Sequence, residues 1–283
     1  GTISLDTLIK GTCEKNRLLN LIENFILFTK VENNDVKIIS KNHQFLGVQN
    51  AIESLNKAGD KNKKLGVFWH TQGSGKSISM MFLTQKILRK KEGDWTFIVV
   101  TDRKELDQQI YKSFLDSGIV KEKQAHAETC NDLKKLLSEN HRFIFTLIHK
   151  FRDETNLVSQ RKNIIVIVDE AHRTQYDTLA LNMRNTLPHA SFLAFTGTPL
   201  ISTEQKTKEV FGEYISKYDF KQSIDDKATV PLFYENRIPE LQISNENINR
   251  EIEEIIEASD LDEDEIKKLE KKFINTYKLI TDE

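Results

Sequence analysis

The chain has 283 residues, of which 38% are hydrophobic and 30% are charged, and its formal net charge is −2 at pH 7. This length fits one large globular domain with shorter appendages, and the composition excludes a fibrous or low-complexity protein. No apolar run in the sequence approaches the roughly 20 residues that a membrane-spanning helix needs, so we expect a cytoplasmic protein without a membrane partner.

The cysteines indicate the redox compartment of the protein, and the first residues indicate whether the sequence is part of a longer chain. Cys13 and Cys130 are single and far apart, which predicts neither a zinc site nor a disulfide framework and fits a reducing compartment. The chain opens with Gly1 and Thr2 instead of an initiator methionine. We therefore expect either a piece cut from a longer polypeptide or a chain from which a tag was cleaved.

Charge is unevenly distributed along the chain. Residues 240–283 contain 14 acidic and 6 basic residues, whereas residues 1–239 contain 35 basic and 29 acidic residues. A mildly basic body can bind a phosphate backbone locally. The acidic tail is expected to form solvated, charged helices rather than to lie along nucleic acid.

Two helices are expected before the first strand. Apolar residues recur with helical spacing over 18–26, and a polar turn follows at 32–35. Residues 1–35 are therefore predicted to form a helical linker, and a second helix is predicted over 41–56.

From residue 65 onward, apolar runs with strand character alternate with amphipathic helices. The predicted strands lie near residues 66–70, 96–101, 142–147, 163–168 and 191–196. The predicted helices lie at residues 76–91, 104–116, 130–139 and 177–186. Such alternation predicts βαβ units, and hence an α/β domain over 36–239 with a central, mostly parallel sheet flanked by helices. Ligands then gather at the carboxyl ends of the strands.

The turn after the first of these strands is rich in glycine. Residues 71–77 read Thr-Gln-Gly-Ser-Gly-Lys-Ser and precede a helix, which is the context of a P-loop that holds a phosphate chain on backbone N–H groups. Lys76 is predicted to reach the β- and γ-phosphates, and the Ser77 hydroxyl to hold Mg²⁺. His70 stands where the motif usually has its first glycine. The other residues predicted to bind nucleotide in this loop are Thr71, Gly73, Ser74 and Gly75.

Two further strand ends carry polar motifs. The apolar run at 163–168 ends in Asp169 and Glu170, which predicts a Walker B site where Asp169 holds Mg²⁺ and Glu170 orients and deprotonates the attacking water. The run at 191–195 ends in Thr-Gly-Thr-Pro, which on its own could be a plain turn. Because a phosphate site is predicted nearby, we interpret this turn as the element that couples the state of the nucleotide to the binding of nucleic acid. Its members are Thr196, Gly197 and Thr198.

These motifs, in this order, resemble those of superfamily 2 helicases, and more narrowly those of the motor (R) subunit of type I restriction enzymes. The segments that carry the resemblance are residues 69–77, 100–109, 146–151, 168–173, 195–200, 210–214 and 230–235. Its more specific parts are Arg-Lys-Glu-Leu-Asp at 103–107 and Phe-Gly-Glu-Tyr at 211–214. The resemblance implies a RecA-like fold, ATP and Mg²⁺ as cofactors, and double-stranded DNA, a methyltransferase subunit and a specificity subunit as partners.

The same resemblance assigns an adenine contact. Gln44 matches the adenine-reading glutamine of the family, and a glutamine amide can both donate to and accept from the adenine edge. Gln49 is the competing candidate, and an ordinary surface glutamine is the plainer interpretation.

The resemblance also assigns contacts to DNA. Thr101 and Arg103 match one motif that contacts the DNA backbone, and Thr146 and Lys150 match the next. Hydroxyls and cations suit phosphate contacts, which position a protein on DNA without reading its sequence. For Lys150, an ordinary solvated lysine is an equally good interpretation.

Two parts of the family pattern are not matched. The family's nuclease domain carries an Asp and a Glu-x-Lys at strand ends, and no such arrangement precedes Gln44; the Glu-x-Lys spacing at 204–206 falls in a polar loop and is discounted. The second RecA-like lobe and its arginine finger are not matched either, so residues 240–283 are expected to be a helical linker toward that lobe. We expect one lobe of a two-lobe motor that turns over little ATP in isolation.

We interpret the chain as the double-stranded DNA translocase lobe of a type I site-specific deoxyribonuclease. Three alternatives stay open. One is a related motor, of a type III restriction enzyme or a DEAH-type RNA helicase. Another is a module that binds nucleotide or DNA without turnover. The third is an assembly element that docks through its acidic tail.

Overall fold

The computed structural model of the chain describes residues 5–31, 34–58, 63–121, 126–151, 159–170, 176–198, 204–231, 233 and 235. The chain divides into two compact units, residues 1–231 and residues 232–283. The helices and strands of the described residues belong to the first unit. The predicted acidic helical tail at 240–283 lies outside the described residues.

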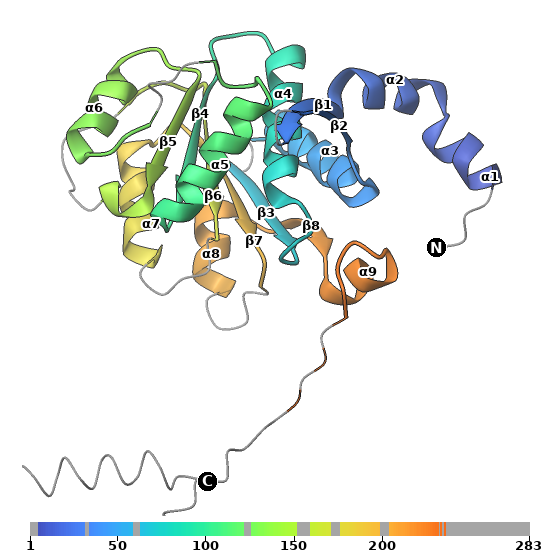
Figure 1. Cartoon of the computed structure of the whole chain (residues 1–283). Helices are drawn as coiled ribbons and strands as arrows, with labels where there is room; N and C mark the ends of the chain where they lie inside the picture. Colours follow the sequence, from blue (N-terminus) through green and yellow to red (C-terminus); the bar gives the residue numbers. More distant parts are fainter. Residues whose placement is uncertain are drawn as a thin grey trace, which may run out of the picture. The chain divides into compact units, whose positions relative to one another are not determined.

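Within the described residues, six strands form the central sheet (Figure 1). In spatial order they are β5 (Phe143–Leu147), β4 (Thr96–Thr101), β6 (Ile164–Asp169), β7 (Ser191–Thr196), β3 (Lys64–His70) and β8 (Tyr214–Tyr218). Every neighbouring pair is parallel. The five predicted strands and the predicted parallel α/β sheet are confirmed, and β8 adds an edge strand that the sequence pattern did not predict.

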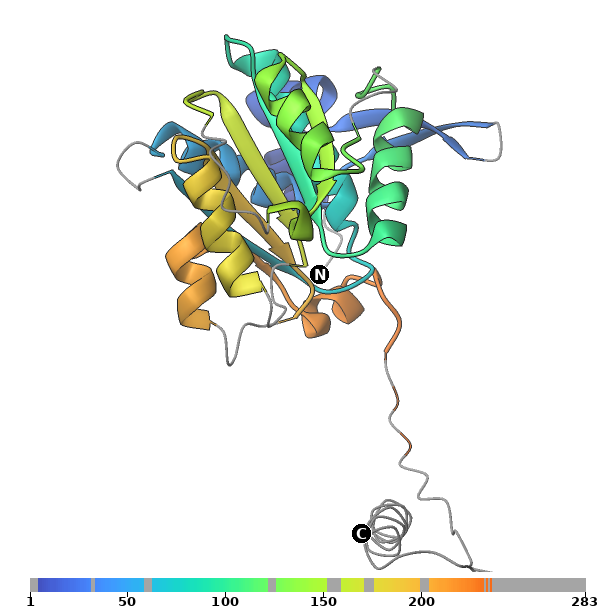
Figure 2. The same cartoon turned by 90° about the vertical axis from the view of Figure 1, so that its left-hand side faces the viewer.

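Helices cover both faces of this sheet. On one face lie α3 (Asn42–Asn56), α4 (Lys76–Lys90) and α5 (Lys104–Asp116). On the other face lie α6 (Cys130–Ser138), α7 (Tyr176–Thr186) and α8 (Glu204–Phe211). In Figure 2 the sheet separates α7 and α8, in yellow and orange, from α5, in green.

The two cores follow from the alternation of side chains along each strand. In β4, Phe97 and Val99 join the core under α3, α4 and α5, whereas Ile98 and Val100 join the core under α6, α7 and α8. All four side chains are completely buried. A strand buried on both faces needs an unbroken apolar run, and this explains why β4 and β6 could be identified from the sequence.

The segment before α3 differs from the predicted helical linker. It contains α1 (Leu5–Thr7), the π-helix η1 (Leu8–Thr12) and α2 (Lys15–Asn24), followed by an antiparallel hairpin of β1 (Ile26–Val31) and β2 (Asn34–Ile39). Strand β1 begins at Ile26, the last residue of the predicted helix, and β2 contains residues 34–35 of the predicted turn, whose residues 32–33 lie outside the described residues. In β1 the apolar side chains point alternately inward and outward, since Leu27 is buried and Phe28 is 62% exposed.

This N-terminal segment is fastened to the far half of α4. The amide of Gln85 donates to the backbone oxygens of Asn24 and Ile26, at 3.2 and 3.3 Å. The ammonium of Lys90 pairs with a carboxylate oxygen of Glu23 at 2.7 Å. The hairpin and α2 are therefore bonded to the helix that begins at the predicted phosphate loop.

Among the helices that the structure describes, none is long and apolar enough to cross a membrane.

Candidate active site

Three of the predicted motifs meet at the carboxyl ends of neighbouring strands. The glycine-rich turn leaves β3, the acidic pair ends β6, and β7, which carries the Thr-Gly-Thr turn, lies between β3 and β6. In the sheet register, Phe195 is opposite Asp169 and Thr196 is opposite Trp69. The sheet therefore brings together side chains that are far apart in the sequence.

The glycine-rich turn has the backbone that a phosphate loop requires. Gly73 and Gly75 have φ values of +81° and +85°, which favour glycine because it lacks a Cβ. A Cβ at Gly75 would also lie 2.6 Å from the amide nitrogen of Gln44. Gly75 is the N-cap of α4, so Lys76 and the half-buried Ser77 stand in the first turn of a long helix, where partial positive charge favours an anion.

Lys76, Glu170 and Gly197 converge on one point. The ammonium nitrogen of Lys76 lies 3.4 Å from a carboxylate oxygen of Glu170. A Cβ built at Gly197 would lie 3.1 Å from that ammonium and 3.5 Å from the same carboxylate. The turn after β7 therefore passes directly over the two groups predicted to do the chemistry, and a side chain there would crowd them.

Asp169 is buried at the end of β6 and is 7% exposed. Burial and, less strongly, the neighbouring Glu170 charge raise the pKa of Asp169 to about 6 against the opposing effect of the Lys76 ammonium. Among the described residues no group donates a hydrogen bond to its Oδ1. A buried carboxylate oxygen of this kind is suited to a cation or to the water around one.

The donor set fits Mg²⁺ in the manner of nucleotide-dependent enzymes. No group of three or more His, Cys, Asp or Glu side chains among the described residues could hold a metal ion by itself. Mg²⁺ is usually held by one or two protein oxygens together with water and substrate phosphates. Buried Asp169 and the half-buried Ser77 provide oxygens of this kind, and their contact with Mg²⁺ stays a prediction.

Glu170 has an unusual backbone. Its φ is +54°, in the left-handed region, which costs a residue other than glycine roughly 1–3 kcal/mol and is concentrated at functional sites. The residue follows directly after β6, so the chain turns sharply where the strand ends. The glutamate at this position is therefore held by the surrounding structure against its own backbone preference.

Of the two glutamines considered for the adenine, Gln44 is the one beside the phosphate loop. Its Nε2 donates to the carbonyl oxygen of Gly75 at 3.1 Å, and its Oε1 accepts from the backbone N–H of Lys41 at 2.8 Å. Gln49 instead accepts from the ammonium of Lys86 at 2.5 Å. The amide of Gln44 supports the loop, and its reading of adenine stays a prediction.

Sequence reasoning missed an aromatic cluster behind the loop. The ring of His43 stacks on Tyr218 with centroids 3.7 Å apart and bonds the carbonyl oxygen of Ser74 at 3.0 Å. His70 is completely buried and bonds the hydroxyl of Ser216 at 2.7 Å. Burial lowers the pKa of His70 to about 3, with smaller contributions from nearby positive charge. His70 was visible as a departure from the motif, but two of its partners lie on β8, the strand that was not predicted.

The residues predicted to contact DNA divide into two pairs. Arg103 is exposed just before α5, and Lys150 is half-buried in the 3-10 turn η2 (Ile148–Phe151). Thr101 and Thr146 are 0% exposed. The predicted contacts of these two threonines with the DNA backbone are therefore corrected: both belong to buried strands, and of the four predicted residues Arg103 and Lys150 are the ones that reach the surface.

A cavity of about 540 Å³ extends from Glu170 to the exposed Arg103. Its lining includes Gln72, Arg103, Glu170, Gly197 and Thr198. Arg103 thus borders the same hollow as the predicted catalytic glutamate. The motif predicted to contact DNA and the predicted phosphate site therefore border one cavity.

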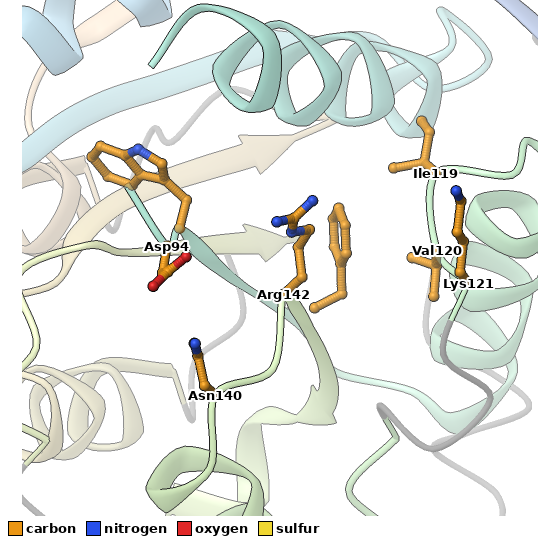
Figure 3. Close-up of a pocket in the computed structure, with 8 residues that line it drawn as sticks. Asp94, Ile119, Val120, Lys121, Asn140 and Arg142 are labelled. Atoms are coloured by element: carbon orange, nitrogen blue, oxygen red, sulfur yellow. The ribbon is translucent and has the colours of Figure 1, made fainter. Parts of the chain in front are cut away.

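A second cavity, of about 270 Å³, lies at the opposite, amino end of β4 and β5. Figure 3 shows Asn140 and Arg142, on the segment that enters β5, across from Ile119 and Lys121. It shares no lining residue with the 540 Å³ cavity. None of the predicted site residues lines it.

Comparisons with known proteins agree with this geometry. A Methanocaldococcus jannaschii protein, provisionally named as the MjaIXP endonuclease subunit of a type I restriction enzyme, is 40% identical over 266 residues, covering 90% of this chain and 25% of its own length. The type I restriction enzyme HindI endonuclease subunit of Haemophilus influenzae is 39% identical over 259 residues, covering 82% and 24%. The chain thus spans about a quarter of the length of these relatives. The resemblance to type I restriction motor subunits is confirmed.

A solved structure and a family comparison agree on the fold. The ATP-dependent Type ISP restriction-modification enzyme LlaBIII bound to DNA superposes on 69% of this chain and 16% of its own, with a TM-score of 0.51 and 13% identity. This likeness shows the fold alone. The family model of the SWI2/SNF2 ATPase matches residues 43–266, from the start of α3 through the whole sheet. Since that match covers most of the chain, the chain belongs to the SWI2/SNF2 ATPase family.

Proposed function

We propose that the chain is the ATP-hydrolysing lobe of the motor subunit of a type I restriction enzyme and that it couples hydrolysis to movement along double-stranded DNA. The observation that carries this proposal is the convergence of Lys76, Glu170 and Gly197, with the ammonium 3.4 Å from the carboxylate. The names of the relatives support the restriction system. The family supports the use of ATP.

The chain's own residues divide the work of phosphoryl transfer to water. The N–H groups of residues 73–77 hold the phosphate chain, and the Lys76 ammonium offsets its charge. Glu170 orients the attacking water and accepts its proton. Asp169 and Ser77 hold Mg²⁺, which when bound offsets charge on the phosphate oxygens.

The turn at residues 196–198 is proposed to couple ATP hydrolysis to DNA binding, because it borders the cavity that Glu170 and Arg103 both line. The Thr196 hydroxyl accepts a bond from the N–H of Thr198 at 3.3 Å and lies 3.1 Å from the carbonyl oxygen of the same residue, which makes the turn around Gly197 compact. A shift of this turn with the phosphates would reach the cavity that Arg103 borders. Arg103 and Lys150 then hold the DNA backbone without reading its sequence. In the assembled enzyme the sequence is read elsewhere, by a specificity subunit that acts with a methyltransferase subunit.

The test is a steady-state ATPase assay of the intact motor subunit with no nucleic acid, with duplex DNA of unrelated sequences, and with RNA. We expect turnover that duplex DNA stimulates irrespective of sequence and that Glu170→Gln abolishes. Stimulation by RNA alone would favour an RNA helicase instead. Nucleotide binding with no turnover under any condition would favour a binding module.

A further inference from the structure

Asp107 is a buried carboxylate next to the predicted DNA-facing motif. It lies in the first turn of α5, is 1% exposed, and its backbone N–H bonds the carbonyl oxygen of Arg103 at 3.0 Å. Its Oδ1 accepts a bond from the hydroxyl of Thr101 at 3.3 Å. Its Oδ2 forms an ion pair with Nε2 of His126. Both oxygens are therefore engaged, as a buried carboxylate requires.

His126 brings a third part of the chain to this carboxylate. It forms an isolated parallel bridge with Phe145 of β5, and the next residue, Ala127, donates its N–H to the oxygen of Phe145 at 2.9 Å. The centroid of its imidazole ring lies 5.7 Å from the centroid of the phenol ring of Tyr111. Asp107 thus joins the end of β4 and the start of α5 to a segment on the outer edge of β5.

The His126 side chain is 26% exposed, so the pair reaches from the interior to the surface. The hydrogen bond to Asp107 raises the pKa of His126 most, and the charges of Asp107 and Glu128 raise it as well; burial and the Lys150 charge lower it. A protonated His126 neutralises Asp107. When His126 loses its proton at higher pH, the negative charge of Asp107 is no longer neutralised. This charge then lies beneath the surface that carries Arg103 and Lys150.

We propose that Asp107 and His126 are a positioning pair for DNA binding. They fix the turn that bears Arg103 against the edge of the sheet, and His126 neutralises the carboxylate of Asp107 beneath that turn. This inference rests on the proposed function as a DNA motor. Arg103 lies one helical turn from Asp107, and Lys150 is close enough to His126 to act on its titration. Removing the proton from His126 therefore places a negative charge near the two cations expected to hold phosphates, which weakens their attraction for DNA.

The experiment measures the affinity of the intact motor subunit for duplex DNA at constant salt from about pH 6 to about pH 9. In the natural protein, affinity should fall as pH rises through the pKa of His126, by at least about fivefold, the lower range for two coupled binding events. His126→Gln should bind more weakly at the low end and show no such step. The matched control is His189→Gln, because His189 is a partly exposed histidine whose ring bonds Gln160 instead. It should follow the natural protein at every pH.

A second measurement does not depend on DNA. The imidazole signal of His126, identified as the one missing in His126→Gln, is titrated by NMR in the natural protein and in Asp107→Asn. The pKa of His126 should be above its ordinary value in the natural protein and should fall in Asp107→Asn. If Asp107→Asn does not fold, the natural protein and His126→Gln still decide the question.

The outcomes separate the two proposals. Failure of the natural protein to bind duplex DNA at any pH would overturn the proposed function and the DNA role of the pair together. DNA binding with no pH step, or with the same step in His126→Gln, would overturn the inference alone. An ordinary pKa for His126 would do the same.

Discussion

Lys76 and Glu170 form an ion pair, although one begins α4 and the other follows β6. Their closest atoms are 3.4 Å apart, and both side chains are largely buried. A γ-phosphate that attracts the ammonium competes with this pair, so we expect nucleotide binding to release the glutamate for action on water. Substitutions at this pair and at the adjacent Asp169 should therefore separate the contributions of these groups to nucleotide binding and to turnover.

Lys76→Ala should abolish ATP turnover by the motor subunit and leave its fold intact, because the ammonium offsets phosphate charge. Steady-state ATPase and circular dichroism measure the two effects. Lys90→Ala, in the last turn of the same helix, is the control, because Lys90 pairs with Glu23 at the surface, where solvent screens the interaction. Full activity of a folded Lys76→Ala protein would sink the assignment.

Glu170→Gln and Asp169→Asn should fail in different ways. The first keeps the shape and loses the base, so we expect retained binding of ATP with Mg²⁺ and turnover at least ~100-fold lower. The second removes a proposed Mg²⁺ contact, so the Mg²⁺ dependence of nucleotide binding should weaken. A nucleotide titration at several Mg²⁺ concentrations distinguishes them, and identical curves would contradict the division of roles.

Arg103→Ala should weaken binding to duplex DNA by a similar factor for all sequences, and the slope of log affinity against log salt should decrease by about 1, as expected for one lost phosphate contact. Arg142→Ala is the matched control, because Arg142 lines the cavity at the opposite end of the sheet (Figure 3). A changed sequence preference would mean that Arg103 reads bases.

Lys86→Met should change how stability depends on pH. Lys86 is 6% exposed, its ammonium bonds Asn20 at 3.0 Å, and burial lowers its pKa to about 8, below the ordinary 10.5. The unfolded chain therefore holds this proton more tightly, so the free energy of unfolding rises with pH between those two values. From about pH 7.5 to about pH 9.5, the natural protein should gain about 2 kcal/mol relative to Lys86→Met.

Urea unfolding of both proteins at the two pH values measures this difference. Taking the difference removes the contribution of other titrating groups that the two proteins share. Parallel pH profiles would mean that Lys86 titrates in the folded protein as it does in the unfolded chain.

The sequence predicted those parts of the fold that local patterns determine. β6 is a continuous apolar run, and Asp169 and Glu170 stand at its end, so both the strand and the acidic pair could be located. β8 could not be, because Tyr-Ile-Ser-Lys-Tyr has a weak pattern and becomes a strand by pairing with β3. The hairpin at 26–39 was missed for the same reason, since pairing between strands is a tertiary event.

The sequence predicted where the candidate site residues lie along the chain, but not which of their side chains are buried. The motif placed Lys76 and Ser77 after a glycine-rich turn at the start of a helix, and they lie in the first turn of α4; their contacts with phosphate and Mg²⁺ stay a prediction. Thr101 and Thr146 match a motif, but a motif does not say which way a strand-end side chain points, and both are buried. The partnership of Asp107 with His126 depends on a bridge to β5 that no local pattern indicates.

The bonding of α4 at both ends has a mechanical consequence. The helix is 15 residues long, so it forms a rigid rod of about 22 Å. Its first turn carries the residues predicted to bind phosphates, and its far half holds α2 and the hairpin through Gln85 and Lys90. We expect a small tilt of this rod on nucleotide binding to appear as lever motion at α2. Hydrogen exchange in α2, rather than in the sheet, should be the more sensitive reporter of the nucleotide.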